Sequence, residues 1–181
     1  MPWYEKLRRY FPVEEMKSKR HMETLLREKP LHYLKDEGPD HVLMYVEFDE
    51  FVFVDYVYVD GRARGRGIGR ELIDRLKARG KPILLEVEPL DYEDSDTEKR
   101  FRFYEREGFR NASRVSYLRP SLATGKKHPL EILYWTPGED TDEVIYEAMC
   151  RVYGDIHCFR DREIYGQPYD PVEEVLSLSE A

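Results

Sequence analysis

The feature that most constrains this chain is a stretch rich in glycine and arginine between a predicted strand and a predicted helix. Residues 62–70 read RARGRGIGR, so four arginines and three glycines meet at one junction. The first turn of a helix offers free backbone N–H groups and the positive end of the helix dipole, which favours anions there. Glycine has no Cβ, so a phosphate can approach the backbone closely. The loop therefore predicts a site for a phosphate-containing ligand.

Two common phosphate-binding patterns do not fit this loop. The P-loop pattern G-x-x-x-x-G-K-[ST] is absent. The dinucleotide pattern G-x-G-x-x-G matches at Gly65 and Gly67 but meets Arg70 at its last position. The loop also follows a predicted antiparallel hairpin, whereas a dinucleotide loop follows the first strand of a parallel sheet. A glycine-rich turn with solvated arginines, or an unrelated phosphoanion-binding domain, stays open as an alternative.

Composition limits the kinds of partner. The chain has 181 residues and a net charge of −8, which suits one α/β domain and disfavours general binding to nucleic acid or anionic membranes. No apolar run is long enough for a signal peptide or a membrane helix, so we expect a cytoplasmic protein. Cys150 and Cys158 form neither a disulfide framework nor a metal-binding pattern, and we predict reduced thiols and no metal site.

Hydrophobic periodicity predicts a mixed α/β fold. The residues from 51 to 59 are nearly all β-branched or aromatic, which is typical of a central strand. A helix after residue 68 joins this strand to another at 83–87, which predicts a parallel pair with a right-handed crossover. The predicted helices lie at 3–10, 12–28, 68–79, 96–108 and 142–153, the last ended by Gly154, and further strands at 31–35, 42–48, 113–118 and 130–135.

Two motifs together resemble the GNAT superfamily of N-acetyltransferases. The first is the loop Arg64-Gly65-Arg66-Gly67-Ile68-Gly69, and the second is the segment from Phe103 to Phe109, which contains Tyr104 and Glu105. The resemblance covers about residues 1–136 and implies a central mixed, twisted sheet flanked by helices. Residues 137–181 are additional, and we expect them to pack on the same domain as a helix and a tail.

The resemblance implies acetyl-CoA as the cofactor and indicates where it would bind. In that family the end of the preceding strand pairs with the pantetheine arm, and the loop holds the pyrophosphate. Thr97 stands where the family often has asparagine, and Arg100 stands where it usually has a small residue. The cofactor-binding residues that follow are Val57, Tyr58, Val59, Arg64, Gly65, Arg66, Gly67, Ile68, Gly69, Arg70, Thr97 and Arg100.

The resemblance also implies transfer of the acetyl group to a primary amine by direct attack in a ternary complex. Tyr104 is then the general acid that protonates the leaving thiolate. For the base we favour Asp55, with a water chain as a rival and with Glu86 and Glu88 nearby in the sequence. The acceptor would be a small molecule or a protein amine, and the protein a monomer or a homodimer. The alternative is an acyl-CoA-binding sensor without transferase activity.

Overall fold

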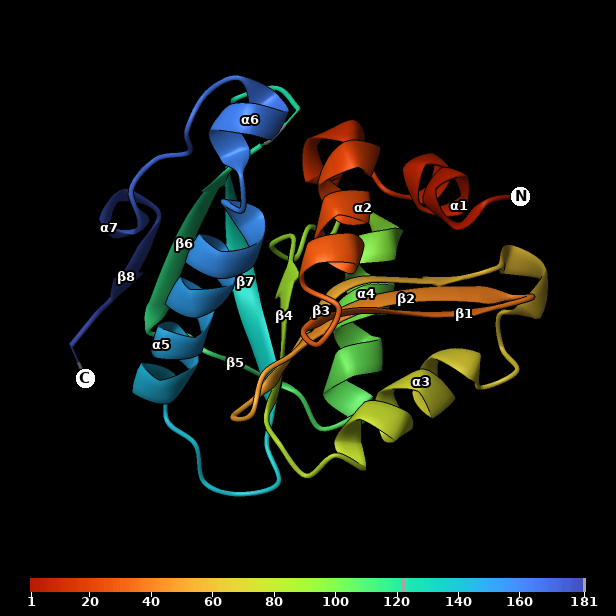
Figure 1. The fold of residues 1–181 in the computed structure, drawn as a ribbon. Coiled ribbons are helices and arrows are strands. Elements are labelled where there is room, and N and C mark those ends of the chain that lie inside the picture. The colour runs from red at the N-terminus through yellow and green to blue at the C-terminus, as the bar shows by residue number, and fades with distance from the viewer. Residues whose placement is uncertain (122, 181) are drawn as a thin grey trace.

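A computed structural model describes residues 1–121 and 123–180 and shows one mixed sheet with helices on both faces (Figure 1). The strand order is β1-β2-β3-β4-β7-β6-β8, and the short β5 pairs with β7. The strands are β1 (Tyr33–Gly38), β2 (His41–Glu47), β3 (Val52–Val59), β4 (Ile83–Val87), β5 (Arg110–Asn111), β6 (Val115–Pro120), β7 (Lys127–Trp135) and β8 (Leu176–Leu178). The α-helices are α1 (Trp3–Tyr10), α2 (Lys19–Glu28), α3 (Ile68–Lys77), α4 (Ser95–Arg106), α5 (Asp142–Val152), α6 (Asp161–Tyr165) and α7 (Val172–Val175).

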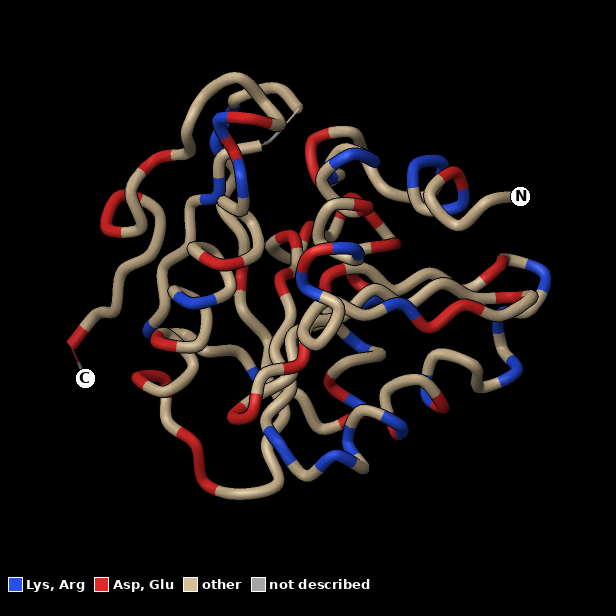
Figure 2. Tube along the Cα trace, in the orientation of Figure 1, with Lys and Arg blue, Asp and Glu red and all other residues tan. Residues whose placement is uncertain are grey.

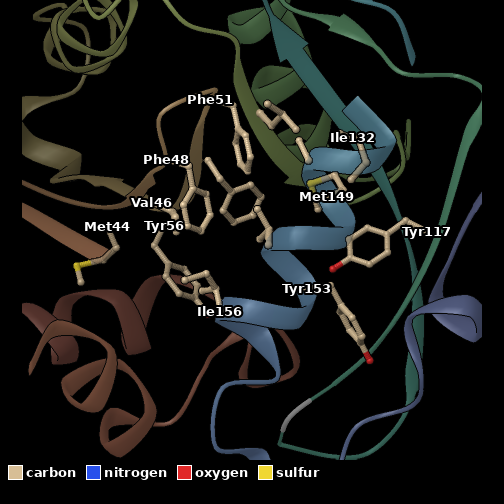
Figure 3. Close-up of a cluster of buried hydrophobic side chains, with 14 of the residues drawn as sticks. Met44, Val46, Phe48, Phe51, Tyr56, Tyr117, Ile132, Met149, Tyr153 and Ile156 are labelled. Atoms are coloured by element: carbon tan, nitrogen blue, oxygen red, sulfur yellow. The ribbon is translucent and has the colours of Figure 1, made fainter. Parts of the chain in front are cut away.

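One face of the sheet is covered by α1, α2 and α5. Leu7 of α1, Leu25 of α2 and Met149 of α5 are fully buried in the same hydrophobic cluster. Figure 3 shows Met149 of α5, and Tyr153 and Ile156 of the helical segment Tyr153–His157 that follows it, among the buried hydrophobic side chains of this cluster. The last strand, β8, extends the sheet by pairing antiparallel with β6. Residues of α5, α7 and β8 are thus part of the same hydrophobic core, whereas the division at residue 136 stays a prediction.

The other face is covered by α3 and α4. Leu72, Ile73 and Leu76 of α3 form a helical stripe that packs on β3 and β4, and Tyr104 of α4 lies in the same cluster. This agrees with the predicted apolar spacing of the helix after residue 68. None of the helices within the described ranges is long and apolar enough to cross a bilayer.

The parallel pairing between β3 and β4 is present but short. It joins only Val52–Val54 of β3 to Ile83–Leu85 of β4. Within the described residues, β3 continues to Val59 while β4 pairs on its other side with β7, so the two strands separate beyond Val54. The register between β2 and β3 shifts at this point, because Met44 pairs with Tyr56 and Tyr45 pairs with Val54. Asp55 is therefore the extra residue of a β-bulge, which redirects the side chains that follow it.

Two predicted helices differ from the structure. The helix expected over residues 12–28 is instead a single 3-10 turn at Val13–Glu15 and then α2, with an extended break between them. The Ser18 hydroxyl accepts a hydrogen bond from the His21 N–H, so α2 has its own N-terminal cap.

The expected stop at Gly154 is also wrong, because the helix continues as a π-helix over Tyr153–His157. Tyr153, Ile156 and His157 on this segment are buried, so their packing against the sheet outweighs the low helix propensity of glycine.

Candidate functional site

A cleft of about 670 Å³ opens where β3 and β4 separate. Its walls come from α1, β3, the loop before α3, the end of β4, α4 and β6. It brings together most of the residues predicted from the sequence: Asp55, Val57, Val59, Arg64, Gly65, Gly67, Ile68, Gly69, Arg70, Arg100 and Tyr104. Tyr58, Arg66 and Thr97 are not among the residues that line it.

The loop before α3 has the geometry that its glycines predict. Gly65 and Gly67 have φ values of 85° and 78°, in the left-handed region that favours glycine. Gly67 is the residue before the first turn of α3, and the space where its Cβ would lie is open. Figure 2 shows basic residues at this turn, between β3 and α3. The first backbone amides of α3 therefore lie at the cleft, at the positive end of the helix dipole.

The three predicted residues outside the lining have other surroundings. The Tyr58 ring packs against the Tyr10 ring at 5.4 Å, and Arg66 is exposed. Thr97 is buried, and its hydroxyl donates to the carbonyls of Asp91 and Asp94 and accepts from the Asp91 N–H. Thr97 thus holds the loop that precedes α4.

Tyr104 lies on the face of α4 that points into the cleft. Its side chain is buried and its ring packs against Phe109 at 5.3 Å. Tyr104 is one of the residues that line the cleft. Burial raises the pKa of this hydroxyl to about 12, so Tyr104 keeps its proton throughout the physiological range. A protonated hydroxyl therefore lies in the cleft, whereas the role of Tyr104 as the general acid stays a prediction.

Asp55 lies in a buried ion pair. Its carboxylate accepts hydrogen bonds from Lys17 Nζ at 2.7 Å and from the Tyr33 hydroxyl at 2.6 Å. Lys17 and Asp55 have side chains that are 0% and 2% exposed. Burial raises the pKa of Asp55, but Lys17 outweighs burial and the net pKa is lowered. A carboxylate that is already neutralised by a buried ammonium is a weak proton acceptor.

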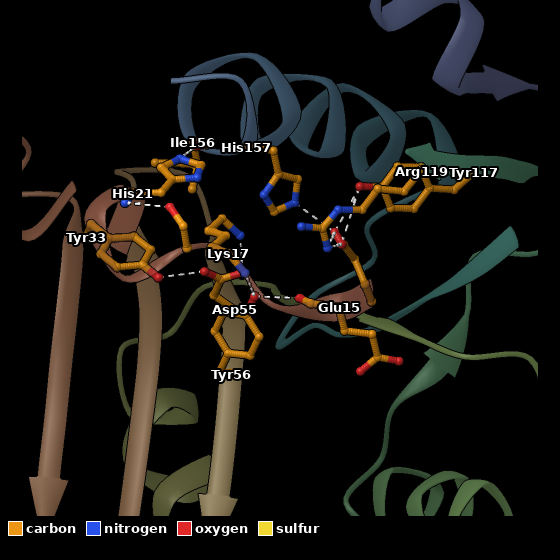
Figure 4. A network of polar contacts seen from close by, with 12 residues as sticks. Glu15, Lys17, His21, Tyr33, Asp55, Tyr56, Tyr117, Arg119, Ile156 and His157 are labelled. Atoms are coloured by element: carbon orange, nitrogen blue, oxygen red, sulfur yellow. Dashed lines mark hydrogen bonds and ion pairs between the residues drawn. The ribbon is translucent and has the colours of Figure 1, made fainter. Parts of the chain in front are cut away.

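The break before α2 is fixed by the same network (Figure 4). The Tyr56 hydroxyl donates to the Glu15 carbonyl at 2.6 Å and accepts from the Lys17 N–H at 2.8 Å. Tyr56 follows the bulge at Asp55, so the bulge directs its side chain toward this segment. The fixed backbone places the Glu15 carboxyl at the cleft.

Glu15 and Glu88 form a pair of carboxyl groups in the cleft. Burial, followed by a hydrogen bond with Glu88 and the charge of Glu88, raises the pKa of Glu15 from 4.5 to about 8, against the guanidinium groups of Arg100 and Arg119. Burial and the neighbouring Glu88 carboxyl both disfavour ionisation of Glu15, so Glu15 titrates above the usual range of a carboxyl group. Sequence reasoning named Glu88 only as a neighbour of Glu86 and missed Glu15, because Glu15 was assigned to a continuous helix.

A second buried ionic group lies beneath this pair. Glu86 accepts hydrogen bonds from the Tyr117 hydroxyl at 2.9 Å and from Arg119 Nη1 at 3.1 Å, and it contacts His157 Nε2 at 2.8 Å. Arg119 is the main cause of the lowered pKa of Glu86. Burial lowers the pKa of His157 to about 4, so the ring is neutral at neutral pH. His157 comes from the π-helix, so the C-terminal elements contribute to the floor of the site.

Comparisons with known proteins agree with this geometry. The acetyltransferase (GNAT) domain family matches residues 32–111. The Bacillus subtilis (strain 168) protein named "Putative acetyltransferase YjbC" is 55% identical over 178 residues, which cover 98% of this chain and 93% of that protein. A GNAT-family structure from Bacteroides thetaiotaomicron has a TM-score of 0.66 at 24% identity and covers 91% of this chain and 90% of its own. The ribosomal-protein-S18-alanine N-acetyltransferase from Escherichia coli has a similar fold, with a TM-score of 0.51 at 20% identity over 76% of this chain and 88% of that one.

Proposed function

Since the chain belongs to the GNAT acetyltransferase family and uses acetyl-CoA, we propose that it acetylates a primary amine by direct attack in a ternary complex. One observation supports this most strongly. A single cleft connects the amides at the start of α3 with Tyr104 and with the Glu15–Glu88 pair. A phosphate site, a proton donor and a proton acceptor are the three groups that this reaction requires.

The cofactor end of the cleft would hold the diphosphate of CoA. The amides of Gly67, Ile68 and Gly69 would bind the phosphates at the helix N-terminus, and Arg64 and Arg70 would add positive charge. The segment Val57–Val59, on the side of β3 that β4 leaves unpaired, would bind the pantetheine arm. A backbone N–H of this segment would stabilise the negative charge on the thioester oxygen.

In the proposed reaction the amine nitrogen attacks the thioester carbonyl carbon, and the C–S bond breaks. Tyr104 donates its proton to the leaving sulfur, so CoA leaves as a thiol. The attacking nitrogen loses a proton to the base. Tyr104 is reprotonated from solvent, and the products are an amide and free CoA.

We propose the Glu15–Glu88 pair as the base in place of Asp55. A pKa of about 8 brings Glu15 nearer to an amine, at about 8 for an α-amino group and about 10 for a lysine side chain, than an ordinary carboxyl group is, so Glu15 is the stronger base. Asp55 lines the same cleft, but its carboxylate is already bonded to Lys17 and Tyr33. Its proposed role is to hold Lys17, and with it the segment that carries Glu15.

Titration calorimetry with CoA, together with a CoA-release assay over a panel of primary amines, tests the function. We expect CoA to bind and at least one amine to be acetylated. In Gly67→Val the β-branched side chain crowds the phosphate site, and valine in the positive-φ conformation of residue 67 costs about 1–2 kcal/mol. We expect at least tenfold weaker CoA binding, with Gly138→Ala in an exposed turn as the control. Unchanged affinity in Gly67→Val would remove the loop from the cofactor site.

The alternative is an acyl-CoA-binding sensor that does not transfer. It is favoured by the position of Thr97, which is bonded into its own loop and lines no part of the cleft. CoA binding without acetylation of any amine, over pH 6 to 10, would support the sensor.

A further inference from the structure

We infer that the acceptor is a small zwitterionic amine, with a carboxylate close to its amino group, as in a free amino acid. Arg119 would bind the carboxylate and the Glu15–Glu88 pair would bind the amine. This rests on the proposed transferase function and specifies its substrate class.

Arg119 places its guanidinium group at the cleft, and only one of the three guanidinium nitrogens hydrogen-bonds to Glu86. Its side chain is 13% exposed and lines the cleft. Only Nη1 contacts Glu86, at 3.1 and 3.4 Å from the two carboxylate oxygens. The hydrogen bonds that the Arg119 side chain makes within residues 1–121 and 123–180 come from Nη1 and not from Nε or Nη2, and the side chain borders the cleft. A guanidinium has five N–H donors, so this side can still bind a second carboxylate through two hydrogen bonds.

The position of Arg119 is fixed before any ligand binds. Its partner Glu86 is itself fixed by the Tyr117 hydroxyl and His157. Figure 4 shows the side chains of Tyr117, Arg119 and His157 pointing toward one another. Because His157 is neutral at neutral pH, it brings no positive charge that would compete with Arg119 for the Glu86 carboxylate. A side chain that is already ordered loses little entropy when it binds a ligand.

The charges in this part of the cleft are mixed. Arg119 and Arg100 lie close enough to Glu15 to lower its pKa against the effect of Glu88. A diamine or polyamine would bring a second positive charge toward these guanidinium groups, which is unfavourable at short range. A simple alkylamine would leave the open side of Arg119 without a partner as water is displaced. A zwitterion matches both signs, with its amine on the carboxyl pair and its carboxylate on Arg119.

The test compares matched acceptors on the wild-type protein. Each free amino acid is compared with its carboxamide and with its decarboxylated amine, by kcat/KM for CoA release and by Kd in the presence of CoA. A bidentate charged contact predicts that the free carboxylate improves kcat/KM and Kd by about 10- to 100-fold. Amides, alkylamines or peptides acetylated as well as any amino acid would overturn the inference, and so would the absence of amino-acid binding. If the wild-type protein does not bind CoA at all, the proposed function itself is contradicted.

A variant provides an independent test. Arg119→Gln should lose the preference for the carboxylate, with a higher KM for the amino acid and a small change for its carboxamide. Arg162→Gln, at an exposed position in α6, is the matched control. Because Arg119→Gln leaves Glu86 unpaired in the core, its melting temperature is measured first. The acceptor series on the wild-type chain decides the question if this variant does not fold. A preference unchanged in a folded Arg119→Gln protein would overturn the role of Arg119.

Discussion

Replacing Glu88 with glutamine tests whether two carboxyl groups share the proton in this cleft. Glu15 has its pKa raised from 4.5 to about 8, a rise of about 3.5 units, by burial first and by Glu88 second. Two unit charges about 4 Å apart interact by about 1 kcal/mol in water and about 4 kcal/mol near a protein surface. At about 1.4 kcal/mol per pKa unit, the charge of Glu88 accounts for about 1–2 units in a half-open cleft. In Glu88→Gln we therefore expect the pKa of Glu15 to fall to about 6–7.

The assay is the pH dependence of kcat between pH 5 and 10, at saturating acetyl-CoA and with one acceptor throughout. The base acts when it is deprotonated, so the rate should rise with pH through the pKa of the pair. The midpoint of this rise should move by about 1–2 pH units to lower pH in Glu88→Gln. Because the acceptor amine also titrates, the comparison is with Glu174→Gln, an exposed residue of α7, which should keep the wild-type midpoint.

Carbon NMR of the glutamate carboxyl groups measures the same pKa without catalysis. A signal that titrates near pH 8 in the wild type, and near pH 6–7 in Glu88→Gln, would support the shared proton. A wild-type spectrum in which every glutamate titrates below pH 5.5 would refute the pair, and so would a rate midpoint that Glu88→Gln leaves unchanged. Glu15→Gln should lower kcat by about 100-fold or more if the pair is the base.

Three further predictions concern the acid, the buried ion pair and the pH dependence of stability. Tyr104→Phe should lower kcat by about 100-fold while the Kd of CoA stays within about twofold, because a general acid acts on the leaving sulfur and not on binding. A kcat equal to that of the wild type would exclude Tyr104 as the general acid. Lys17→Met should lower the free energy of unfolding by about 3–5 kcal/mol in urea denaturation, since it leaves the charge of Asp55 without a counterion in the core. Adding Asp55→Asn to the Lys17→Met protein should restore part of that loss. Burial lowers the pKa of His157 from 6.5 to about 4 in the folded protein, so the unfolded chain takes up a proton on this residue at a higher pH than the folded one. The contribution of His157 to stability should therefore be complete above pH 6.5 and fall as the pH drops toward 4. In His157→Gln, melting temperatures measured by calorimetry should depend less on pH in this window.

The sequence alone determined the half of the cleft that we propose binds the cofactor. Glycines at 65 and 67, with arginines between a strand and a helix, are a local pattern, and the structure shows both glycines in the conformation that they favour. The strand at 83–87 and its parallel pairing also followed from local periodicity and crossover length. The side chain of Tyr104 reaches the cleft as the second motif implied. These features depend on residues close together in the chain, so short-range rules were sufficient.

Only the tertiary structure decided the half of the cleft that we propose binds the acceptor. Glu15 and Glu88 are 73 positions apart in the sequence, and their contact depends on the bulge at Asp55 and on the Tyr56 hydroxyl that holds the break before α2. Asp55 appeared in the sequence as an unpaired carboxylate in an apolar strand, and its partner Lys17 comes from a segment 38 residues away. Proton affinity depends on burial and on neighbouring charges, which long-range packing sets. The sequence shows which carboxyl groups exist, but only the fold shows which of them are neutralised and which are available to accept a proton.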